Sequence, residues 1–443
     1  MKLTLCSLAM AAAASLGAQP AGVPLELSMR KAVDLAISEE GSARVKLARE
    51  MQLQAGTRAA QVRAALLPNL DGSVSQQNTV RNLAALGVRF SIPGTDFQIP
   101  RVVGPFNIFD ARVSATQSIF DFSQIRRYQS ARAAARAAGA EVESSRDQVA
   151  AQTAVAYLAA IRADADVRES QANIGLAEAI LRSAENQKSA GTGTGIEITR
   201  AQVQLAYARQ RLLIAENARN RARLQLLRLI GLPLDANVEL TGRMEVAPVA
   251  ADILKDAEAT AQAARSDLKA QLEREENARL SYSATRLERL PSLAGFADYG
   301  SIGSSINNAL PTRTYGASLR IPIFDGGRRD ARRAEAASQL RQEQVRTADL
   351  REHVALEVRL ALDGLRSAAE QVKVAESGVE LAEQELAHAR RRVEAGVASG
   401  LELTDAQTRV ERARDNRIAA LFNYNQARID LGQATGTIRR MLQ

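Results

Sequence analysis

A glycine-rich run, Gly-Thr-Gly-Thr-Gly at residues 191–195, is the first candidate for chemistry in this sequence. Such a run can cradle a phosphate when a buried strand precedes it and Lys followed by Ser or Thr comes after it. Here Ile196 and Glu197 follow the run, and no buried strand pattern precedes it. The pattern therefore predicts a turn and not a nucleotide site.

The metal-binding and nucleophilic residue types are few and scattered. His353 and His388 lie five heptads apart on one predicted helix, roughly 50 Å from each other, so one chain cannot bring both to one metal ion. The single cysteine, Cys6, lies in the first ten residues, which excludes a disulfide scaffold, a thiolate zinc site and a catalytic thiol. No nucleophile elbow or zinc-binding helix pattern is present. The sequence predicts no enzyme, with no catalytic residue, cofactor or metal.

The composition points to long, closely packed helices. Only 4% of the 443 residues are aromatic, there is no Trp, and the hydrophobic fraction of 46% comes mainly from Ala. This combination is typical of long helices and not of a layered α/β enzyme. The formal charge is +8, but Arg and Glu alternate along the chain. We interpret the excess as solvated helix faces, so no nucleic-acid partner is expected.

Proline spacing and heptads place these helices. Residues 106–232 and 323–443 contain no proline. About 70 residues separate Asp325 from Gly396, which corresponds to a helix of roughly 100 Å. Apolar residues recur every seventh position, with Ala on a second seam, as in coiled coils. The heptad series are Val358, Leu365, Val372, Val379, Leu386 and Val393; Leu403, Val410, Arg417, Tyr424 and Leu431; and Ile198, Leu205, Leu212, Arg219 and Leu226.

The chain repeats itself once. Residues 190–202 align with 395–407, and residues 118–121 align with 322–325. Each half reads helix, Pro, strand, loop, strand, Phe-Asp, very long helix, glycine turn, helix. The first half carries 19 extra residues, which we place in a longer loop at 81–105.

Four segments follow from the repeat and from the N-terminus. Residues 1–18 have the short apolar run and small residues of a secretory signal peptide. Residues 19–231 form the first repeat, 232–253 an inter-repeat segment and 254–443 the second repeat. No downstream run reaches 18 apolar residues, so a helical inner-membrane protein is excluded.

Segments next to the long helices alternate between apolar and polar residues. The clearest are 109–119 and 314–323, whose length and pattern match transmembrane β-strands. A soluble hairpin is the alternative for each pair alone. Four strands cannot close a barrel, and open strand edges are not tolerated in lipid. Several copies must then share one barrel, with eight strands from two copies or twelve from three, and the pattern does not choose between them.

At this point the sequence resembles the outer membrane efflux protein family, the TolC-like outer-membrane channels. The resemblance covers essentially the whole mature sequence. Its marks are Leu-Ser-Met-Arg-Lys-Ala-Val-Asp-Leu-Ala at 27–36, Ala-Ala-Leu-Leu-Pro-Asn-Leu at 64–70, two Phe-Asp pairs after strands and two Ala-Gly turns. Each mark alone is weak, but their order, found twice, is specific.

The resemblance implies a mainly α fold with a small β part: a duplicated protomer of long coiled-coil helices plus four transmembrane β-strands. Three protomers would form a twelve-stranded barrel in outer-membrane lipid and a periplasmic α-helical tunnel. Residues 232–253 would supply part of a mixed equatorial region. The homotrimer would be a passive duct, joined by a periplasmic adaptor, or membrane fusion protein, to an inner-membrane pump that supplies the energy.

The resemblance also assigns roles to the two turns. Gly191-Thr192 and Gly396-Val397 match the tips that dock the adaptor, although an apolar residue is usual where Thr192 stands. The alternative, compatible with docking, is that these glycines end helices in left-handed geometry.

Three acidic residues follow the tips. Glu402 and Asp405 lie three apart on one helix face and match carboxylates that ring the periplasmic entrance, where three chains would place six. Such a ring would attract cations. Glu197 matches the acid in the other repeat, and Arg200 stands opposite Asp405 in the alignment. The helix dipole favours an acid in a first turn, which accounts equally well for Glu197 and Glu402.

One departure and one rival function remain. Val393 and Ala398 stand where the TolC subgroup has a Tyr and an Arg that hold the entrance closed, so closure must use other contacts. The rival is a soluble periplasmic coiled-coil adaptor or filament, although an adaptor would carry one helical hairpin and not two repeats. The sequence does not specify the exported substrate or which pump and adaptor are used.

Overall fold

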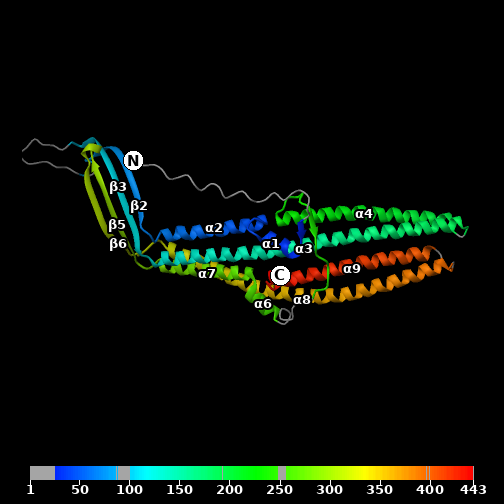
Figure 1. The fold of residues 1–443 in the computed structure, drawn as a ribbon. Helices are drawn as coiled ribbons and strands as arrows, with labels where there is room; N and C mark the ends of the chain where they lie inside the picture. Colours follow the sequence, from blue (N-terminus) through cyan, green and yellow to red (C-terminus); the bar gives the residue numbers. More distant parts are fainter. Residues whose placement is uncertain are drawn as a thin grey trace, which may run out of the picture.

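The computed structural model describes residues 25–85, 87, 100–191, 193–247, 256–395, 397–398 and 400–442. The molecule is elongated, with a four-stranded sheet at one end and helices that run to the other (Figure 1). The signal peptide predicted at residues 1–18 lies outside the described residues.

The order of elements is the predicted one, present twice along the chain. Each repeat has a helix, two antiparallel strands, a very long helix and a second long helix. The duplicated, mainly α fold is confirmed, whereas the division at residues 231/232 and 253/254 stays a prediction. In chain order the elements are β1 (Leu25–Leu27), α1 (Met29–Ile37), α2 (Ala43–Ala64), β2 (Asn69–Asn82), β3 (Val102–Phe120), α3 (Phe122–Ser189), α4 (Gly195–Ile230), β4 (Val238–Leu240), α6 (Ala257–Ala264), α7 (Ser266–Leu287), β5 (Ser292–Gly303), the 3-10 turn η1 (Ile306–Asn308), β6 (Leu310–Arg320), α8 (Arg328–Glu394), α9 (Gly400–Ala434) and α10 (Ile438–Met441).

The Phe-Asp pairs start the two longest helices. Helix α3 has 68 residues and α8 has 67, which gives each a length of roughly 100 Å. At the start of α3, Asp121 accepts a hydrogen bond from the Gln124 N–H at 3.1 Å. Asp325 likewise accepts from the Arg329 N–H at 3.1 Å. Each Asp satisfies an N–H that the first helical turn cannot, which explains why this residue recurs in both repeats.

Small residues fill the helix seams. The α3/α4 and α8/α9 hairpins lie side by side and contact each other through α3 and α9 (Figure 1). Arg417, which the heptad series places in a seam, is exposed instead. The buried seam residues of the second hairpin include Leu365, Ala368, Val372, Val379, Ala382, Ala389, Leu403, Ala406, Val410, Ala420 and Leu431. Because Ala is small, the helices approach closely and form a wall one layer thick.

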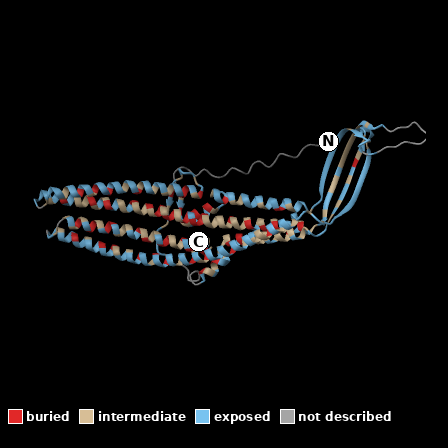
Figure 2. Ribbon diagram, turned by 180° about the vertical axis from the view of Figure 1, so that it is seen from behind, coloured by how far each residue is buried: buried red, intermediate tan, exposed pale blue. Residues whose placement is uncertain are grey.

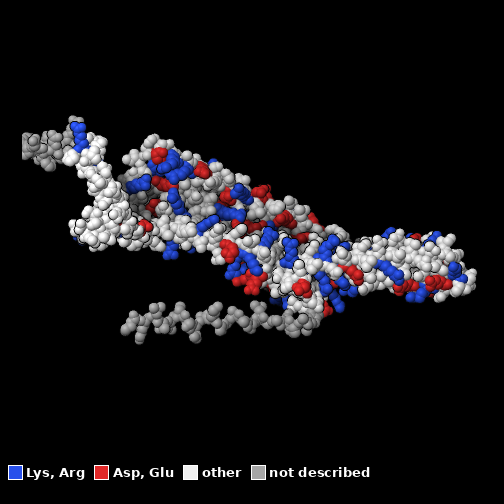
Figure 3. Space-filling view, turned by 90° about the horizontal axis from the view of Figure 1, so that it is seen from above, with Lys and Arg blue, Asp and Glu red and all other residues white. Residues whose placement is uncertain are grey.

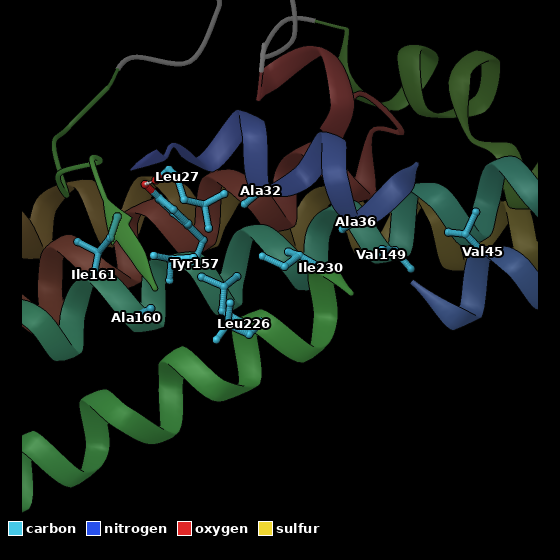
Figure 4. Close-up of a cluster of buried hydrophobic side chains, with 12 residues drawn as sticks. Leu27, Ala32, Ala36, Val45, Val149, Tyr157, Ala160, Ile161, Leu226 and Ile230 are labelled. Carbon is cyan, nitrogen blue, oxygen red and sulfur yellow. Dashed lines mark hydrogen bonds between the residues drawn. The ribbon is translucent and has the colours of Figure 1, made fainter. Parts of the chain in front are cut away.

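The best-packed core lies halfway along the rod, where β1 pairs in parallel with β4. Tyr157 of α3 is fully buried there (Figure 4). Its hydroxyl donates to the Leu27 carbonyl oxygen at 2.8 Å and accepts from the Gly242 N–H at 3.1 Å. A Cβ on Gly242 would lie 2.9 Å from the Tyr157 hydroxyl oxygen, so only glycine fits at position 242. This core joins the inter-repeat segment to the first long helix.

The four longer strands form one antiparallel sheet in the order β2–β3–β5–β6. Strand β3 has 19 residues and is longer than the eleven-residue segment predicted at 109–119. The strand predicted at 314–323 was placed too far along, since β6 ends at Arg320. Pro322 has no N–H to continue the ladder and restricts the residue before it, which explains the earlier end.

The loop predicted at residues 81–105 is shorter than expected. The ladder between β2 and β3 continues to the pair Asn82 and Val102, so the connection spans residues 83–101. Residues 86 and 88–99 of that connection lie outside the described residues.

Candidate functional site

The ends of the two hairpins lie together at the end of the rod opposite the sheet (Figure 1). At the first tip, Gly191 follows α3 with φ +75°, and its N–H donates to the Lys188 carbonyl oxygen at 3.0 Å. At the second, the exposed Val397 donates its N–H to the Arg392 carbonyl oxygen at 3.0 Å. Thr192 and Gly396 lie outside the described residues. Gly191 ends α3 in left-handed geometry, which is the structural role that the sequence suggested for it beside adaptor docking.

The Glu197 side chain caps the start of its own helix, α4. It is the third residue of α4, and its Oε2 accepts a hydrogen bond from the Thr194 N–H at 3.0 Å. With the Thr194 side chain this forms a capping box, in which two N–H groups of the helix start are satisfied reciprocally. The Glu197 carboxylate therefore has a structural task at the place where the sequence predicts an entrance residue.

The second tip arranges its acids differently. The carboxylate of Glu402 forms an ion pair with the Arg392 guanidinium across the hairpin, with Nε and Oε1 3.1 Å apart. Asp405, on the next turn of α9, is exposed and has no ion-pair partner among the described residues. Of the three acidic residues predicted at the entrance, Asp405 is thus the one with neither an ion pair nor a capping role among the described residues.

Apolar residues pack at positions 393 and 398, where the TolC subgroup has the Tyr and Arg that hold the entrance closed. Val393 packs beside Leu403 and Ala406 in a small cluster that also includes Ala389. Ala398 is half-buried. The two helices of the second hairpin are held at this level by side-chain packing and by the Arg392 ion pair.

A groove of about 740 Å³ lies between the starts of α4 and α9. Its apolar lining comes from Ile196, Val203 and Leu401, which are 64%, 47% and 54% exposed. Sequence reasoning missed these residues. The signal was present, since the repeat alignment pairs Gly195-Ile196 with Gly400-Leu401. An exposed apolar groove at the end of a rod is a surface suited to a helical partner.

At the other end of the molecule the two faces of the sheet differ in polarity. Residues that pair directly in an antiparallel ladder share a face. By this register one face carries large exposed apolar residues from all four strands. They are Leu70, Val74, Val113, Tyr299, Tyr315 and Leu319. Figure 2 shows the two edge strands, β2 and β6, as almost wholly exposed.

The opposite face carries a charged cluster. Arg112 pairs with Asp110 at 2.6 Å on its own strand and with Asp298 at 3.4 Å on the next. Gly300 leaves room for the Arg112 side chain, because a Cβ there would lie 2.5 Å from the Arg112 Cβ. Strands β2 and β6 are the two edges of the sheet, and no described residue pairs with their outer sides.

The outermost helices also expose apolar residues. In the half of the rod nearer the hairpin tips these helices are α4 and α8, and in the half nearer the sheet they are α2 and α8 (Figure 1). A subset of their exposed large apolar residues falls at helical spacing along one face of each helix. This subset is Leu47 and Met51 on α2; Ile196, Val203, Tyr207 and Ile214 on α4; and Val345, Leu356, Leu360, Val374 and Leu381 on α8. Leu53 on α2 and Leu213 and Leu224 on α4 are also exposed but lie off these faces.

The described residues contain neither a membrane-crossing helix nor a cluster of metal-binding side chains. None of their helices is both long enough and apolar enough to cross a membrane. No group of three or more His, Cys, Asp or Glu in the described ranges could hold a metal ion. His353 instead lies 3.1 Å from Glu357, one turn along α8.

The family match decides the identity of the chain. Residues 38–232 and 259–437 match the sequence model of the family described as "Outer membrane efflux protein". The chain belongs to the outer membrane efflux protein family. As a member, it is an outer-membrane exit duct of an efflux or secretion system, located in the outer membrane with a periplasmic extension.

Two relatives of this efflux protein extend the comparison. It is 23% identical to the alkaline protease secretion protein AprF of Pseudomonas aeruginosa over 82% of this chain and 75% of that protein. It is 25% identical to the pyoverdine export outer membrane protein OpmQ of Pseudomonas putida, over 63% of this chain and 60% of that protein.

Solved structures share the fold of this efflux protein. The Campylobacter jejuni outer membrane channel CmeC superposes with a TM-score of 0.79 at 17% identity, covering 99% of this chain and 94% of that one. The Vibrio cholerae outer membrane protein VceC gives a TM-score of 0.76 at 17% identity, covering 92% of this chain and 96% of that one. The resemblance inferred from the repeat is confirmed.

An ionic network joins the two hairpins of the efflux protein near the middle of their contact. Arg211 of α4 binds Asp415 at 2.6 Å and Glu411 at 3.4 Å, both on α9. Arg414 of α9 binds Glu169 of α3 at 3.1 Å. Burial raises the pKa of the Glu411 carboxyl; the Arg211 charge opposes the rise, and the Asp415 charge adds to it. Sequence reasoning missed this network, because its partners lie 200 or more residues apart and no local pattern marks them.

Proposed function

We propose that three copies of this chain assemble into one passive duct that crosses the outer membrane and the periplasm. The observation that carries the proposal is the open four-stranded sheet, whose edges β2 and β6 have no partner strand among the described residues. Backbone groups at such edges must pair inside a bilayer, so β6 of one copy would pair with β2 of the next.

Three copies fit a duct better than two. An eight-stranded barrel has an interior just wide enough for side chains to fill, whereas twelve strands leave an open lumen. The exposed apolar face of the sheet would then meet lipid. The face with Asp110, Arg112 and Asp298 would line the lumen.

The helices support the same assembly. The apolar stripes on α2, α4 and α8 lie on the two outer sides of one protomer. In a ring, the stripe on α8 of one copy would pack against α2 and α4 of its neighbour. That contact would remove the stripes from water and close the one-layer wall into a tunnel. The repeats at 19–231 and 254–443 would each contribute one hairpin to the tunnel, with 232–253 in its equatorial region.

The two tips would form the inner end of the duct. Asp405 and Glu402 from three copies would surround the axis as an acidic entrance. Gly191, Thr192, Gly396 and Val397 would present the tip turns to a periplasmic adaptor. The apolar groove at Ile196 and Leu401 would receive an apolar helix face of that adaptor.

Transport energy would come from an inner-membrane pump, and the duct would carry out no reaction of its own. The names of the two relatives refer to a secreted protease and to pyoverdine. Ducts of one architecture therefore serve different cargo, and the pump and adaptor would select it. The soluble adaptor or filament suggested by the coiled coils alone is disfavoured by the family match.

The proposal is tested by measuring both the mass of the assembly and its conductance. Protein extracted from outer membranes with detergent is expected to have the mass of three chains and to lose that mass only on heating. The same preparation is expected to give long-lived single-channel conductance in planar bilayers. A soluble monomer in the periplasmic fraction, or a trimer without conductance, would contradict the proposal.

A further inference from the structure

Charged residues are scarce in the four-stranded sheet. Figure 3 shows the sheet largely white, with charges of both signs over the helices. Three of the charged residues in its strands form the cluster around Arg112. The others are Asp71, Arg81, Arg313 and Arg320. This second set holds one acid and three arginines, and the position of each arginine decides which of them is suited to pair with Asp71.

The ladder places Asp71 and Arg320 on the same face of the sheet. Residues that pair directly share a face, and so do residues an even number of positions apart on one strand. One row of direct pairs crosses the sheet through Asp71, Ser114, Asp298 and Thr314. Arg320 lies an even number of positions after Thr314 on β6. Asp71 and Arg320 therefore lie on the face of the Arg112 cluster, which would line the lumen.

The same two residues lie at the same end of the sheet. Asp71 is near the start of β2, and Arg320 is the last residue of β6. Both strand ends adjoin the helices (Figure 1). Arg81 lies at the other end of β2. Arg313 lies beside Thr314 on β6 and so belongs to the other face. Of the three arginines, Arg320 alone shares both the face and the end of Asp71.

Within one chain these two charges do not meet. Both residues are exposed, and neither forms an ion pair with a described residue. They lie on the two edge strands, which are three strand spacings, or roughly 14 Å, apart. Each neighbouring pair of strands is antiparallel, so β6 runs antiparallel to β2. The β6 edge of one copy can therefore continue the antiparallel ladder onto the β2 edge of another.

The lengths of the edge strands limit the register of that pairing. Strand β6 has 11 residues, and the regular part of β2, from Asn69 to Thr79 before its bulge, has the same length. Pairing them end to end puts Arg320 opposite Asn69 and leaves Asp71 as its diagonal neighbour, at roughly 7–8 Å between backbones. A shift of two residues along β2 puts Arg320 directly opposite Asp71. Both registers bring the two side chains within reach of an ion pair.

We propose that Arg320 of one copy forms an ion pair with Asp71 of the next copy at each seam of the barrel. The pair lies on the lumen side, at the end of the strands that adjoins the helices. The inference rests on the proposed function, because the seam exists only if β6 of one copy pairs with β2 of the next. The pair also helps to select the register, since a slip by one residue would turn one of the charges toward lipid.

Charge reversal in the outer-membrane trimer tests the pair. Dissociation in SDS at a fixed raised temperature is followed by gel mobility. Asp71→Arg and Arg320→Asp each place like charges at every seam, so the dissociation rate is expected to rise on the order of tenfold. The swap, Asp71→Arg/Arg320→Asp, restores opposite charges and is expected to dissociate at nearly the wild-type rate. The matched control, Asp71→Arg/Arg81→Asp, has the same net charge as the swap but is expected to dissociate as fast as Asp71→Arg.

Cysteine cross-linking tests the same contact without reversing any charge. The natural cysteine, Cys6, lies in the predicted signal peptide. In Asp71→Cys/Arg320→Cys, a short bifunctional thiol reagent is expected to join neighbouring copies into a covalent trimer that survives boiling in SDS. The matched control is Asp71→Cys/Arg313→Cys, whose second cysteine lies on the other face of β6. It is expected to run as a monomer after the same treatment.

Two results would overturn the pair. One is a swap variant that dissociates as fast as the single reversals. The other is equal cross-linking in the two cysteine variants. Either result leaves the proposed function standing, because the mass of the wild-type assembly is measured before these treatments. A wild-type protein that is not a trimer would instead contradict the proposed function, and the pair with it.

Discussion

The two hairpin tips come from one repeated sequence, yet they use their charges differently. At the first tip, Gln187, Glu197 and Arg200 occupy the positions that Arg392, Glu402 and Asp405 occupy at the second. Glu197 caps its own helix. Glu402 instead reaches across the hairpin to Arg392, and Asp405 is left unpaired.

The difference teaches which residue can serve an entrance. Both acids are the third residue of their helix, and both follow a Thr or Ser three positions earlier, at Thr194 and Ser399. Arg392 lies across the second hairpin and pairs with Glu402, whereas Gln187 stands at the corresponding position of the first hairpin. Among the three predicted entrance acids, Asp405 is therefore the one that neither caps a helix nor pairs with a cation among the described residues. The predictions below separate the tips, starting with the largest effect.

Neutralising Asp405 is expected to have the largest effect on ion flow. In the assembled duct, Asp405→Asn removes three unpaired carboxylates from around the axis. Block by a trivalent cation added from the tip side is expected to weaken on the order of tenfold, because the ring concentrates cations electrostatically. Single-channel recordings measure this block, and Glu197→Gln is the matched control at the other tip. If Asp405→Asn and Glu197→Gln weakened the cation block equally, the proposed difference between the tips would be wrong.

Substitutions at Glu402 and at its partner Arg392 are expected to change the cation block less than Asp405→Asn does, and in opposite directions. Glu402→Gln is expected to weaken the block only about two- to threefold, because Arg392 already screens this carboxylate. Arg392→Gln frees Glu402 and is expected to strengthen the block. Measuring both variants in the same recordings sharpens the assignment. A block that weakens in Arg392→Gln would show that the arginine itself, and not the freed acid, shapes the entrance.

At the first tip the expected effect is on helix stability. Loss of the capping box in Thr194→Ala costs about 0.5–1 kcal/mol of local stability. Hydrogen exchange at the first turns of α4 is expected to accelerate while cation block stays unchanged. The corresponding amides of α9 serve as an internal control. Unchanged exchange at the start of α4 would show that the cap contributes nothing in the assembled protein.

The smallest effect concerns the ionic network between the hairpins. The pKa of Glu411 is raised, so in the folded state its charged form is disfavoured. The stabilisation linked to this group is present at low pH, below its unfolded pKa, and is lost as pH rises through the raised folded value. At neutral pH, Glu411→Gln is therefore expected to melt slightly higher than the wild type. The gap in Tm should close as the pH falls toward the ordinary range of Glu. A gap that widens on acidification would mean that the Arg211 ion pair outweighs burial.

The sequence predicted the features that depend on periodic patterns, namely the long helices and the internal repeat. Heptads fixed the long helices, and the offset of 205 residues paired Gly191 with Gly396. It placed the end of β6 wrongly, because alternation continues through Ile321 and Ile323 although Pro322 cannot extend the ladder. It also left the role of Glu197 open, although Thr194 and Glu197 carry the spacing of a capping box.

What could not be predicted depends on contacts between distant segments. The Glu402 pair needs the geometry of a closed hairpin, and the Arg211 network needs two hairpins side by side. No local pattern records such proximity.

The most direct measurement is a paired single-channel recording of the wild type and Asp405→Asn in planar bilayers. The account predicts that both conduct at similar size, and that a trivalent cation added from the tip side blocks the wild type far more strongly. Absence of conductance in the wild type would contradict the duct itself. Conductance with identical block in the two proteins would contradict an entrance formed by the second tip.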